Sequence, residues 1–341
     1  MLAEQHFQSL SRLAGPLGVR LALLVGGQGT VLRRELLTAV ASGSVQLVVG
    51  THALLRPEVR FPDLALVVVD EQHRFGVTQR QALYEKGPQA HVLIMTATPI
   101  PRSLALTLYG DLDVSVLDEL PAGRQPIRTA LRTPDRRDRI FAFVAEELRA
   151  GRQAYIIYPL IEESGRSDLT SALEAHAELC AGPLAGFEVG LLHGRLPAEE
   201  KARTMEGFVA GRIQALVSTT VIEVGVDVPN ASVIVIEHAE RFGLAQLHQM
   251  RGRVGRGAAA SYCILVAYPS EGETDPTPRL EALCQTQDGF ALARRDLELR
   301  GPGELLGTRQ AGVPDLVVAD PVRDEDLLVL ARELARSGAL P

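Results

Sequence analysis

The sequence predicts an α/β fold with mostly parallel sheets, and three observations support this class. Its 341 residues suffice for about two domains with hydrophobic cores. Its short apolar runs are largely uninterrupted, as in strands that are buried on both faces of a parallel sheet. Polar, helix-forming stretches separate these runs, and such alternation of strand and helix is typical of parallel α/β proteins.

The predicted elements follow one another along most of the chain. We expect strands at 45–49, 64–69, 92–95, 114–117, 154–158, 189–192, 215–218, 233–236 and 262–266. Between them we expect helices at 31–41, 78–86, 102–109, 135–149 and 198–210. Pro197 should occupy the first helical position of the last of these, because a proline there loses no helical hydrogen bond.

Two breaks divide this pattern. Prolines and a glycine interrupt both periodicities at 120–126, as a linker would. After Tyr268, residues 269–278 are rich in proline, glycine and acidic residues, and beyond them the pattern becomes helical without strands. We therefore expect three parts, at 1–121, 122–268 and 269–341.

Composition excludes several classes of protein. A hydrophobic content of 46% excludes a disordered chain. With 42 acidic against 35 basic residues, binding of nucleic acid by bulk charge is not expected. Low aromatic content (4%) and the absence of Trp argue against an aromatic platform for stacking bases. The three cysteines form no CxxC pair, and the first residues do not resemble a signal peptide, which is typical of a soluble cytoplasmic protein.

Two strand ends carry polar residues suited to catalysis or coupling. Asp70 and Glu71 follow the predicted strand at 64–69, and ligands bind beyond the carboxyl ends of parallel strands. One carboxylate there could hold Mg²⁺ through water while its neighbour orients or deprotonates an attacking water. An acidic turn explains this pair equally well. Thr96 and Thr98 follow the next strand and could bridge to a neighbouring domain, although a proline-rich turn is the better interpretation of that segment alone.

A third strand end presents Thr219, followed by Gly225 and Asp227. Hydroxyls and backbone N–H groups at such a place can hold a nucleic-acid phosphate. Asp227 could accept a hydrogen bond from a ribose hydroxyl. A loop glycine and a helix cap are equally good interpretations of Gly225 and Asp227.

Three arginines, Arg251, Arg253 and Arg256, fall within six residues and are separated by glycines. Their fork-shaped guanidinium groups suit phosphate, and the glycines allow close approach of the backbone. A solvated basic face is the less favoured interpretation, because helix surfaces rarely interleave glycine and arginine in this way.

Lysine chemistry can depend on only two residues, Lys86 and Lys201. ATP motors that use an acidic pair also need a phosphate loop, Gly-x-x-x-x-Gly-Lys-Ser/Thr. Neither lysine follows a glycine-rich turn, and the glycine-rich segment at 26–30 contains no lysine. That segment is better interpreted as a turn before the helix at 31–41.

Taken in order, the four segments resemble motifs II, III, V and VI of superfamily-two helicases. Residues 70–77 (DEQHRFGV), 96–102 (TATPIPR), 109–115 (YGDLDVS) and the tail at 288–312 are similar to the RecG family of bacterial ATP-dependent DNA helicases. The resemblance covers almost the whole chain. The transcription-repair coupling translocase shares the RFGV and PIPR segments but lacks the GDLDV stretch, and is the weaker alternative.

The resemblance implies two RecA-like domains, the first of them partial, followed by a C-terminal helical element that couples ATP hydrolysis to DNA movement. Asp70 would bind the Mg²⁺ of the nucleotide through water and Glu71 would activate the attacking water. The residues that would couple hydrolysis to motion are Gln72, His73, Thr96, Thr98, Arg300, Arg309 and Gln310. Those that would reach or line the nucleotide cleft are Gly225, Asp227, Gln249, Arg253 and Arg256. Those that would follow the DNA backbone are Gly50, Thr51, His193, Gly194 and Thr219.

The resemblance also implies a function and partners. Helicases of this kind use ATP and Mg²⁺ to remodel stalled replication forks and branched DNA. A monomer in the bacterial cytoplasm, with branched DNA and single-stranded DNA-binding protein as partners and no membrane, is the corresponding expectation. A non-catalytic RecA-like module that binds nucleic acid or protein is the alternative from a different class.

Compared with the family, residue 1 aligns beyond the phosphate-loop lysine. The chain would therefore lack the wedge domain, the adenine-reading segment, the phosphate loop and motif Ia. We expect an unpaired or rearranged sheet edge beside the strand that ends at Asp70. We also expect this chain alone to hydrolyse ATP very poorly.

Overall fold

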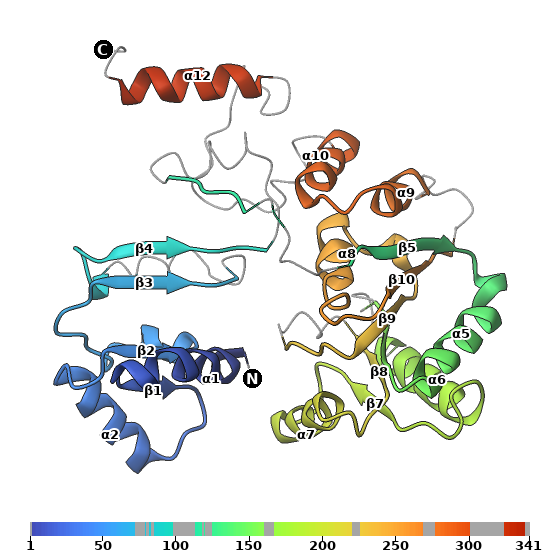
Figure 1. The fold of residues 1–341 in the computed structure, drawn as a ribbon, viewed down its shortest axis with the longest axis horizontal. Coiled ribbons are helices and arrows are strands. Elements are labelled where there is room, and N and C mark those ends of the chain that lie inside the picture. The colour runs from blue at the N-terminus through green and yellow to red at the C-terminus, as the bar shows by residue number, and fades with distance from the viewer. Residues whose placement is uncertain are drawn as a thin grey trace. The chain divides into compact units, whose positions relative to one another are not determined.

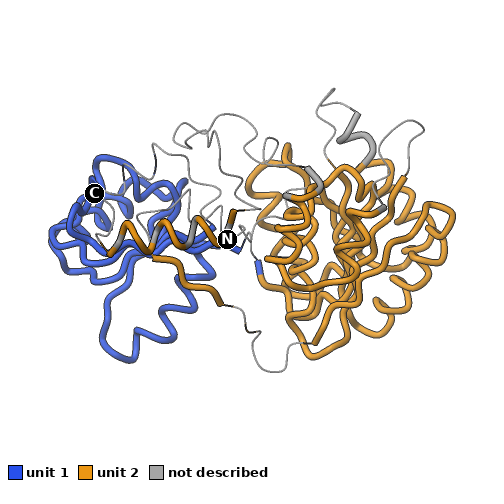
Figure 2. Tube along the Cα trace, turned by 90° about the horizontal axis from the view of Figure 1, so that it is seen from above, with its two compact units in different colours: residues 1–98, 224–226 blue, residues 99–223, 227–341 orange. Residues whose placement is uncertain are grey.

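The computed structural model describes residues 2–71, 79, 82, 85–97, 113–117, 119, 125–159, 167–219, 226–268, 277–300 and 324–337. The chain divides into two compact units (Figure 2). Unit 1 comprises Met1–Thr98 with Val224–Val226, and unit 2 comprises Pro99–Glu223 with Asp227–Pro341. Among the described residues, no helix combines the length and apolar character that crossing a lipid bilayer requires.

Unit 1 contains two separate pairs of parallel strands in its described part (Figure 1). Strands β1 (Leu21–Leu24) and β2 (Leu47–Gly50) form one pair, and helix α1 (Leu2–Ala14) packs against both. Helix α2 (Thr30–Ala41) contributes Val40 to a small core with Leu24, Ala53 and Val59. Two short 3-10 helices, η1 (Gly15–Leu17) and η2 (His52–Leu55), complete this part.

The second pair in unit 1 consists of β3 (Leu66–Val69) and β4 (His91–Ile94). One face of this pair is exposed, with Leu66 56% and Leu93 50% accessible. Within the described part of the chain, β3 pairs with β4 and with no other strand.

Unit 2 is built on a six-stranded, all-parallel sheet, as the uninterrupted apolar runs predict (Figure 1). The strands lie in the order β5-β10-β9-β6-β8-β7. Every residue of the central strands β6, β8 and β9 is buried. The strands are β5 (Ile127–Arg132), β6 (Gln153–Ile157), β7 (Val189–Leu192), β8 (Ala215–Ser218), β9 (Ala231–Ile236) and β10 (Ser261–Val266).

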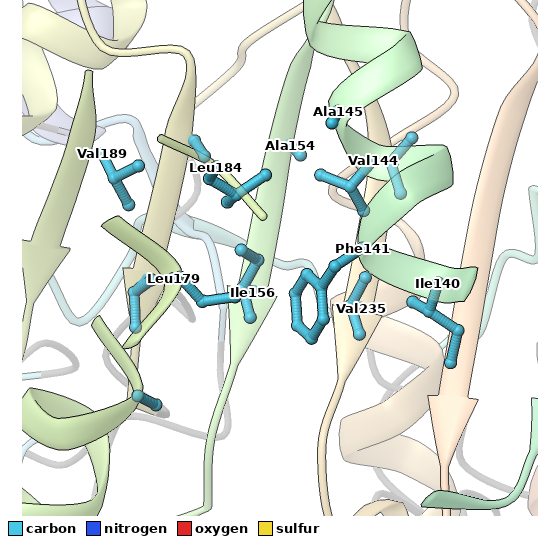
Figure 3. Close-up of a cluster of buried hydrophobic side chains, with 14 of the residues drawn as sticks. Ile140, Phe141, Val144, Ala145, Ala154, Ile156, Leu179, Leu184, Val189 and Val235 are labelled. Carbon is cyan, nitrogen blue, oxygen red and sulfur yellow. The ribbon is translucent and has the colours of Figure 1, made fainter. Parts of the chain in front are cut away.

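Helix α5 (Arg137–Arg149) covers one face of this sheet. Its buried residues recur at helical spacing, so that Phe141 and Val144 point towards Ile156 of β6 and Val235 of β9 (Figure 3). Full burial of a side chain of this size contributes about 1.5–3 kcal/mol to folding. Helix α6 (Ser167–Ala181) packs into the same core, and α7 (Ala198–Val209) packs against β7.

The C-terminal elements of the described chain are helical. Helices α9 (Thr277–Gln285) and α10 (Gly289–Arg300) contact each other and α8 (Leu244–Arg251), and α12 (Glu325–Arg336) follows. No strand occurs in the described residues beyond β10, which agrees with the prediction for this part.

Most predicted elements are confirmed, with some differences. The strands predicted at 189–192 and 215–218 coincide with β7 and β8, and those at 45–49, 64–69, 92–95, 154–158, 233–236 and 262–266 overlap β2, β3, β4, β6, β9 and β10. The strand predicted at 114–117 is wrong, because residues 113–117 form no strand and Leu117 is 96% exposed. Pro197 is the N-cap of α7 rather than its first helical residue, with an extended ψ of 148°.

The predicted helices have a mixed outcome. Those at 31–41, 135–149 and 198–210 correspond to α2, α5 and α7, although α5 starts at Arg137 because Pro134–Arg136 first form a 3-10 turn. The helix predicted at 102–109 lies outside the described residues, and most of the one at 78–86 does too. The sequence analysis missed helices α1, α6 and α8 and strands β1 and β5.

Candidate functional site

The acidic pair of unit 1 lies at the carboxyl end of β3. Asp70 Oδ1 accepts a hydrogen bond from the backbone N–H of Glu71 at 2.9 Å, and Glu71 adopts a left-handed φ of 54°. This conformation is uncommon for a residue other than glycine and is found often at functional sites. Thr96 follows the neighbouring strand β4 and is exposed at the same end of the strand pair.

The sequence reading missed a partner of Asp70 on helix α1. The Nε2 atom of His6 lies 3.2 Å from Asp70 Oδ2. A single histidine on a helix far away along the chain carries no motif, so only the fold reveals this contact. Asp70 remains partly exposed and retains acceptor capacity, so it fits a water-mediated Mg²⁺ whose other ligands come from a nucleotide and water.

Gly50 and Thr51 follow β2 and have local structural roles. A Cβ atom on residue 50 would lie 2.3 Å from the carbonyl oxygen of Leu24, so only glycine fits at this strand end. Thr51 caps the following 3-10 helix, with Oγ1 accepting from the N–H of Ala53 at 3.5 Å. These contacts fix the loop that was predicted to follow the DNA backbone.

In unit 2, adjacent strand ends bring three predicted residues together. His193 and Gly194 follow β7 and Thr219 follows β8, and the Thr219 N–H donates to the carbonyl of Leu192 at 3.2 Å. His193 Nδ1 and Thr219 Oγ1 are buried without a hydrogen-bond partner among the described residues. Buried polar atoms are rarely left unpaired, so both atoms are candidates for contact with a ligand.

Charges around the strand end affect His193. Burial, followed by the nearby cations Lys201 and Arg195, lowers its pKa, although Glu200 opposes this effect. The imidazole is therefore neutral at pH 7 and can both donate and accept a hydrogen bond.

Asp227 and Arg256 form an ion pair in unit 2. Arg256 Nη1 donates to Asp227 Oδ1 at 3.2 Å, and its Nε donates to the carbonyl of Gly252 at 3.2 Å. A Cβ on Gly257 would lie 2.3 Å from the carbonyl oxygen of Pro229, so this glycine lets the arginine loop approach the loop that carries Asp227.

Two further predicted residues lie near this ion pair in the sequence. Arg253 is buried and Gln249 is half-buried on α8. The charges of Arg253, Arg256 and Asp227 all act on Tyr155 of β6, whose pKa is raised mainly by burial.

The structure corrects the interpretation of Arg251 as a phosphate ligand. Arg251 is only 2% exposed, and its Nη1 donates to the carbonyls of Leu283 at 2.7 Å and Thr286 at 2.8 Å. Its Nη2 lies 2.8 Å from His248 Nδ1. Arg251 therefore ties α8 to the end of α9.

A buried ion pair outside the predicted site also went unrecognised in the sequence. Glu237, directly after β9, is fully buried and accepts from Arg137 Nε at 3.1 Å and from the Tyr268 hydroxyl at 2.8 Å. Arg137 also donates to Glu178 and to the Tyr158 hydroxyl. This network holds the first residue of α5 against the sheet.

Both lysines hold backbone carbonyls. Lys86 Nζ donates to the carbonyls of Arg56 and Val59, each at 2.8 Å, and Lys201 Nζ donates to the carbonyl of Gly194 at 2.5 Å. In the described structure, both lysine side chains therefore make local contacts with backbone carbonyls.

Several predicted residues cannot be placed. The residues that lie outside the described part of the chain are Gln72, His73, Thr98, Gly225, Arg309 and Gln310. Arg300 ends α10, but its side chain is not described.

Three family models match successive parts of the chain. They are "DEAD/DEAH box helicase" over residues 1–107, "Helicase conserved C-terminal domain" over 138–258 and "ATP-dependent DNA helicase RecG, domain 3, C-terminal" over 286–338. The last of these models begins in the tail that follows the strands of unit 2.

The chain is similar to curated proteins named ATP-dependent DNA helicase RecG. It is 52% identical to that of Synechocystis, covering 99% of this chain and 40% of the relative. It is 52% identical to that of Bacillus subtilis, covering 98% of this chain and 48% of the relative. The chain thus spans half or less of the length of these curated relatives.

Solved structures agree with this similarity. A structure of RecG bound to a three-way DNA junction matches with 44% identity and a TM-score of 0.74, covering 96% of this chain and 42% of that one. S. cerevisiae Dbp5, solved with RNA, matches with 18% identity and a TM-score of 0.59, which supports the RecA-like fold alone.

Proposed function

The chain is homologous to the bacterial RecG helicases along nearly its whole length, and we propose that it is the motor part of a RecG-type, ATP-dependent DNA helicase. Its substrates would be stalled replication forks and other branched DNA, and it would act as a monomer in the bacterial cytoplasm, with single-stranded DNA-binding protein as a further partner. The observation that carries this proposal is that the similarity continues through the tail at 286–338, whose family model is specific to RecG.

We assign the parts of the chain as predicted. Residues 1–121 form a partial first RecA-like domain, 122–268 the second, and 269–341 the coupling element. The limits of the three family models support this assignment, whereas the division of contacts falls earlier, near residue 98, and places the second and third parts in one unit.

Unit 1 contributes the acid chemistry in this proposal. Asp70 holds Mg²⁺ through water, and Glu71 takes a proton from the attacking water. The contact of His6 with Asp70 fixes the orientation of that carboxylate. Bound ATP supplies the anhydride bond whose cleavage drives motion.

Unit 2 contributes cations and the DNA contacts. Gln249, Arg253 and Arg256 bind the phosphates of the nucleotide, and Arg256 exchanges Asp227 for a phosphate oxygen when it does so. In other phosphoryl-transfer enzymes an arginine of this kind raises the rate by about 10³–10⁵. The unpaired buried atoms of His193 and Thr219 support a role for this strand end in holding the DNA backbone.

Junction binding tests the DNA-binding part of the proposal. We expect the chain to bind a fluorescent three-way DNA junction, and His193→Ala to weaken binding about tenfold in anisotropy titrations. His91→Ala, which removes an exposed histidine of β4, is the matched control and should leave binding unchanged. Equal binding by the two variants and the wild type would remove His193 from the DNA site.

Phosphate release tests the catalytic part. Because both lysines are engaged by carbonyls, we propose that this chain alone hydrolyses ATP very poorly even with junction DNA present. The rate should be compared with that of a full-length RecG relative. A similar turnover for both would contradict the proposal, whereas a low rate that Glu71→Gln abolishes would support the role of the acidic pair.

A further inference from the structure

Unit 2 has an open groove of about 1210 Å³ that contains none of the predicted site residues. It lies over the edge strand β5 and its neighbour β10, between the start of α5 and helix α9. Tyr262 pairs with Arg128 and Ile264 with Ala130, so these four side chains share one face of the sheet. The volume exceeds the roughly 300–1,000 Å³ of typical small-molecule pockets, which favours a larger ligand.

The rim of the groove is strongly basic. Arg128 and Arg132 come from β5, Arg136 and Arg139 come from the turn and helix that follow, and all four are exposed. Glu281 is the one acidic residue among the lining side chains, although Asp135 lies 3.3 Å from Arg136. Such a concentration of arginine in a chain of net charge −7 is complementary to an acidic ligand.

The floor of the groove is apolar. It is lined by Ala130, Ile140, Phe143 and Ile264. Apolar side chains of a ligand could cover these residues. A groove with an apolar floor and an arginine rim matches a segment that carries both carboxylates and apolar side chains.

The two aromatic residues of the groove, Tyr262 and Phe143, pack against each other. The ring of Tyr262 packs edge-on with Phe143, with centroids 4.9 Å apart, and the guanidinium of Arg128 lies over it at 5.9 Å. Single-stranded nucleic acid usually binds by stacking bases on exposed aromatic faces. The occupied ring therefore favours a peptide over a nucleic-acid strand.

The sheet edge beside the groove is closed at its start. The side-chain amide of Gln287 donates to the Ile127 carbonyl and accepts from the Ile127 N–H, each at 3.3 Å, as a neighbouring strand would. A ligand is therefore recognised by its side chains in the groove rather than by adding a strand to β5.

We propose that this groove docks an acidic, apolar-anchored peptide segment of a partner protein. Carboxylates of the segment pair with the four arginines, and its apolar side chains cover Ala130, Ile140 and Ile264. This inference does not depend on the proposed motor function, because no residue of the predicted site takes part.

Peptide binding to the full chain tests the proposal. The probe is a fluorescein-labelled peptide that alternates aspartate and leucine, and binding is followed by anisotropy. We expect binding that the double variant Arg128→Glu/Arg132→Glu weakens at least tenfold. The matched control, Arg149→Glu/Arg203→Glu, makes the same charge change on exposed residues outside the groove and should bind as the wild type does.

Two further measurements keep the test decisive. If the first double variant is unfolded by circular dichroism, Arg136→Glu/Arg139→Glu replaces it. A peptide in which serine replaces leucine should bind more weakly, because it cannot cover the floor. The proposal would be overturned if the peptide did not bind, or if the groove and control variants lost peptide affinity equally. It would also be overturned if a groove variant lost affinity for junction DNA but not for the peptide, which would indicate a nucleic-acid surface.

Discussion

The two units carry similar apolar strands in different surroundings. In unit 2, the central strands have neighbours on both edges and helices on the sheet face, and all residues of β6 and β9 are buried. In unit 1, β3 has an equally continuous apolar sequence, yet Leu66 and Val68 are more than half exposed among the described residues. Similar apolar runs can therefore form strands that differ in burial, because burial depends on neighbouring elements that the run itself does not encode.

The largest expected difference between the units comes from truncating a side chain in each. Phe141→Ala in α5 removes a ring that is 2% exposed and leaves a cavity, so the free energy of unfolding of unit 2 should fall by about 3–5 kcal/mol. Urea unfolding of the purified variant measures this loss. Leu93→Ala in β4, a half-exposed site, serves as the counterpart in unit 1 and should cost less than about 1 kcal/mol. If both variants lost a similar free energy of unfolding, the proposed difference in packing between the two units would be wrong.

A smaller loss of stability should show that unit 1 is tightly packed around Gly50. Gly50→Ala places a Cβ against the Leu24 carbonyl and should lower the free energy of unfolding of unit 1 by about 1–3 kcal/mol. Gly29→Ala is the matched control, since its Cβ meets no atom within 4 Å and its φ of −57° suits alanine. If both variants unfold at the same urea concentration, β1 and β2 are less rigid than their contacts indicate.

The smallest expected effect is a pH dependence confined to unit 2. Burial lowers the pKa of His193, so the unfolded chain binds a proton more readily than the folded chain does. Stability should therefore be constant above the unfolded pKa of about 6.5 and fall as the pH drops below it, by less than about 1.4 kcal/mol per pH unit. Urea unfolding from pH 5 to 8 measures the slope, and His193→Gln should flatten it. An unchanged slope in that variant would assign the effect to other groups.

The strands of unit 2 were predictable because their apolar runs are continuous and bounded by polar residues. Strand β5 was missed because Arg128, Thr129 and Arg132 interrupt its apolar residues, as is typical of an edge strand with an accessible face. The run at 114–117 misled the prediction, because an apolar run also occurs where no strand partner is described.

The positions of Asp70, Glu71 and Thr219 were predictable because each follows a strand end, whereas His193 was named only through the family resemblance. The contact of His6 with Asp70 joins residues that are 64 positions apart and leaves no local signal. Among the clustered arginines, sequence spacing could not show that Arg251 ends helix α8 with its guanidinium turned inward to the carbonyls of Leu283 and Thr286. The orientation of a side chain depends on tertiary packing, and a sequence motif does not specify that packing.

The two lysines make this chain unusually simple to label. Lys86 belongs to unit 1 and Lys201 to unit 2, and they are the only lysine side chains of the sequence. Burial lowers the pKa of the Lys86 amine. With the α-amino group blocked, a donor and acceptor dye pair attached at these two positions would report the distance between the units without any engineered cysteine. Changes in that distance could then be followed in single molecules.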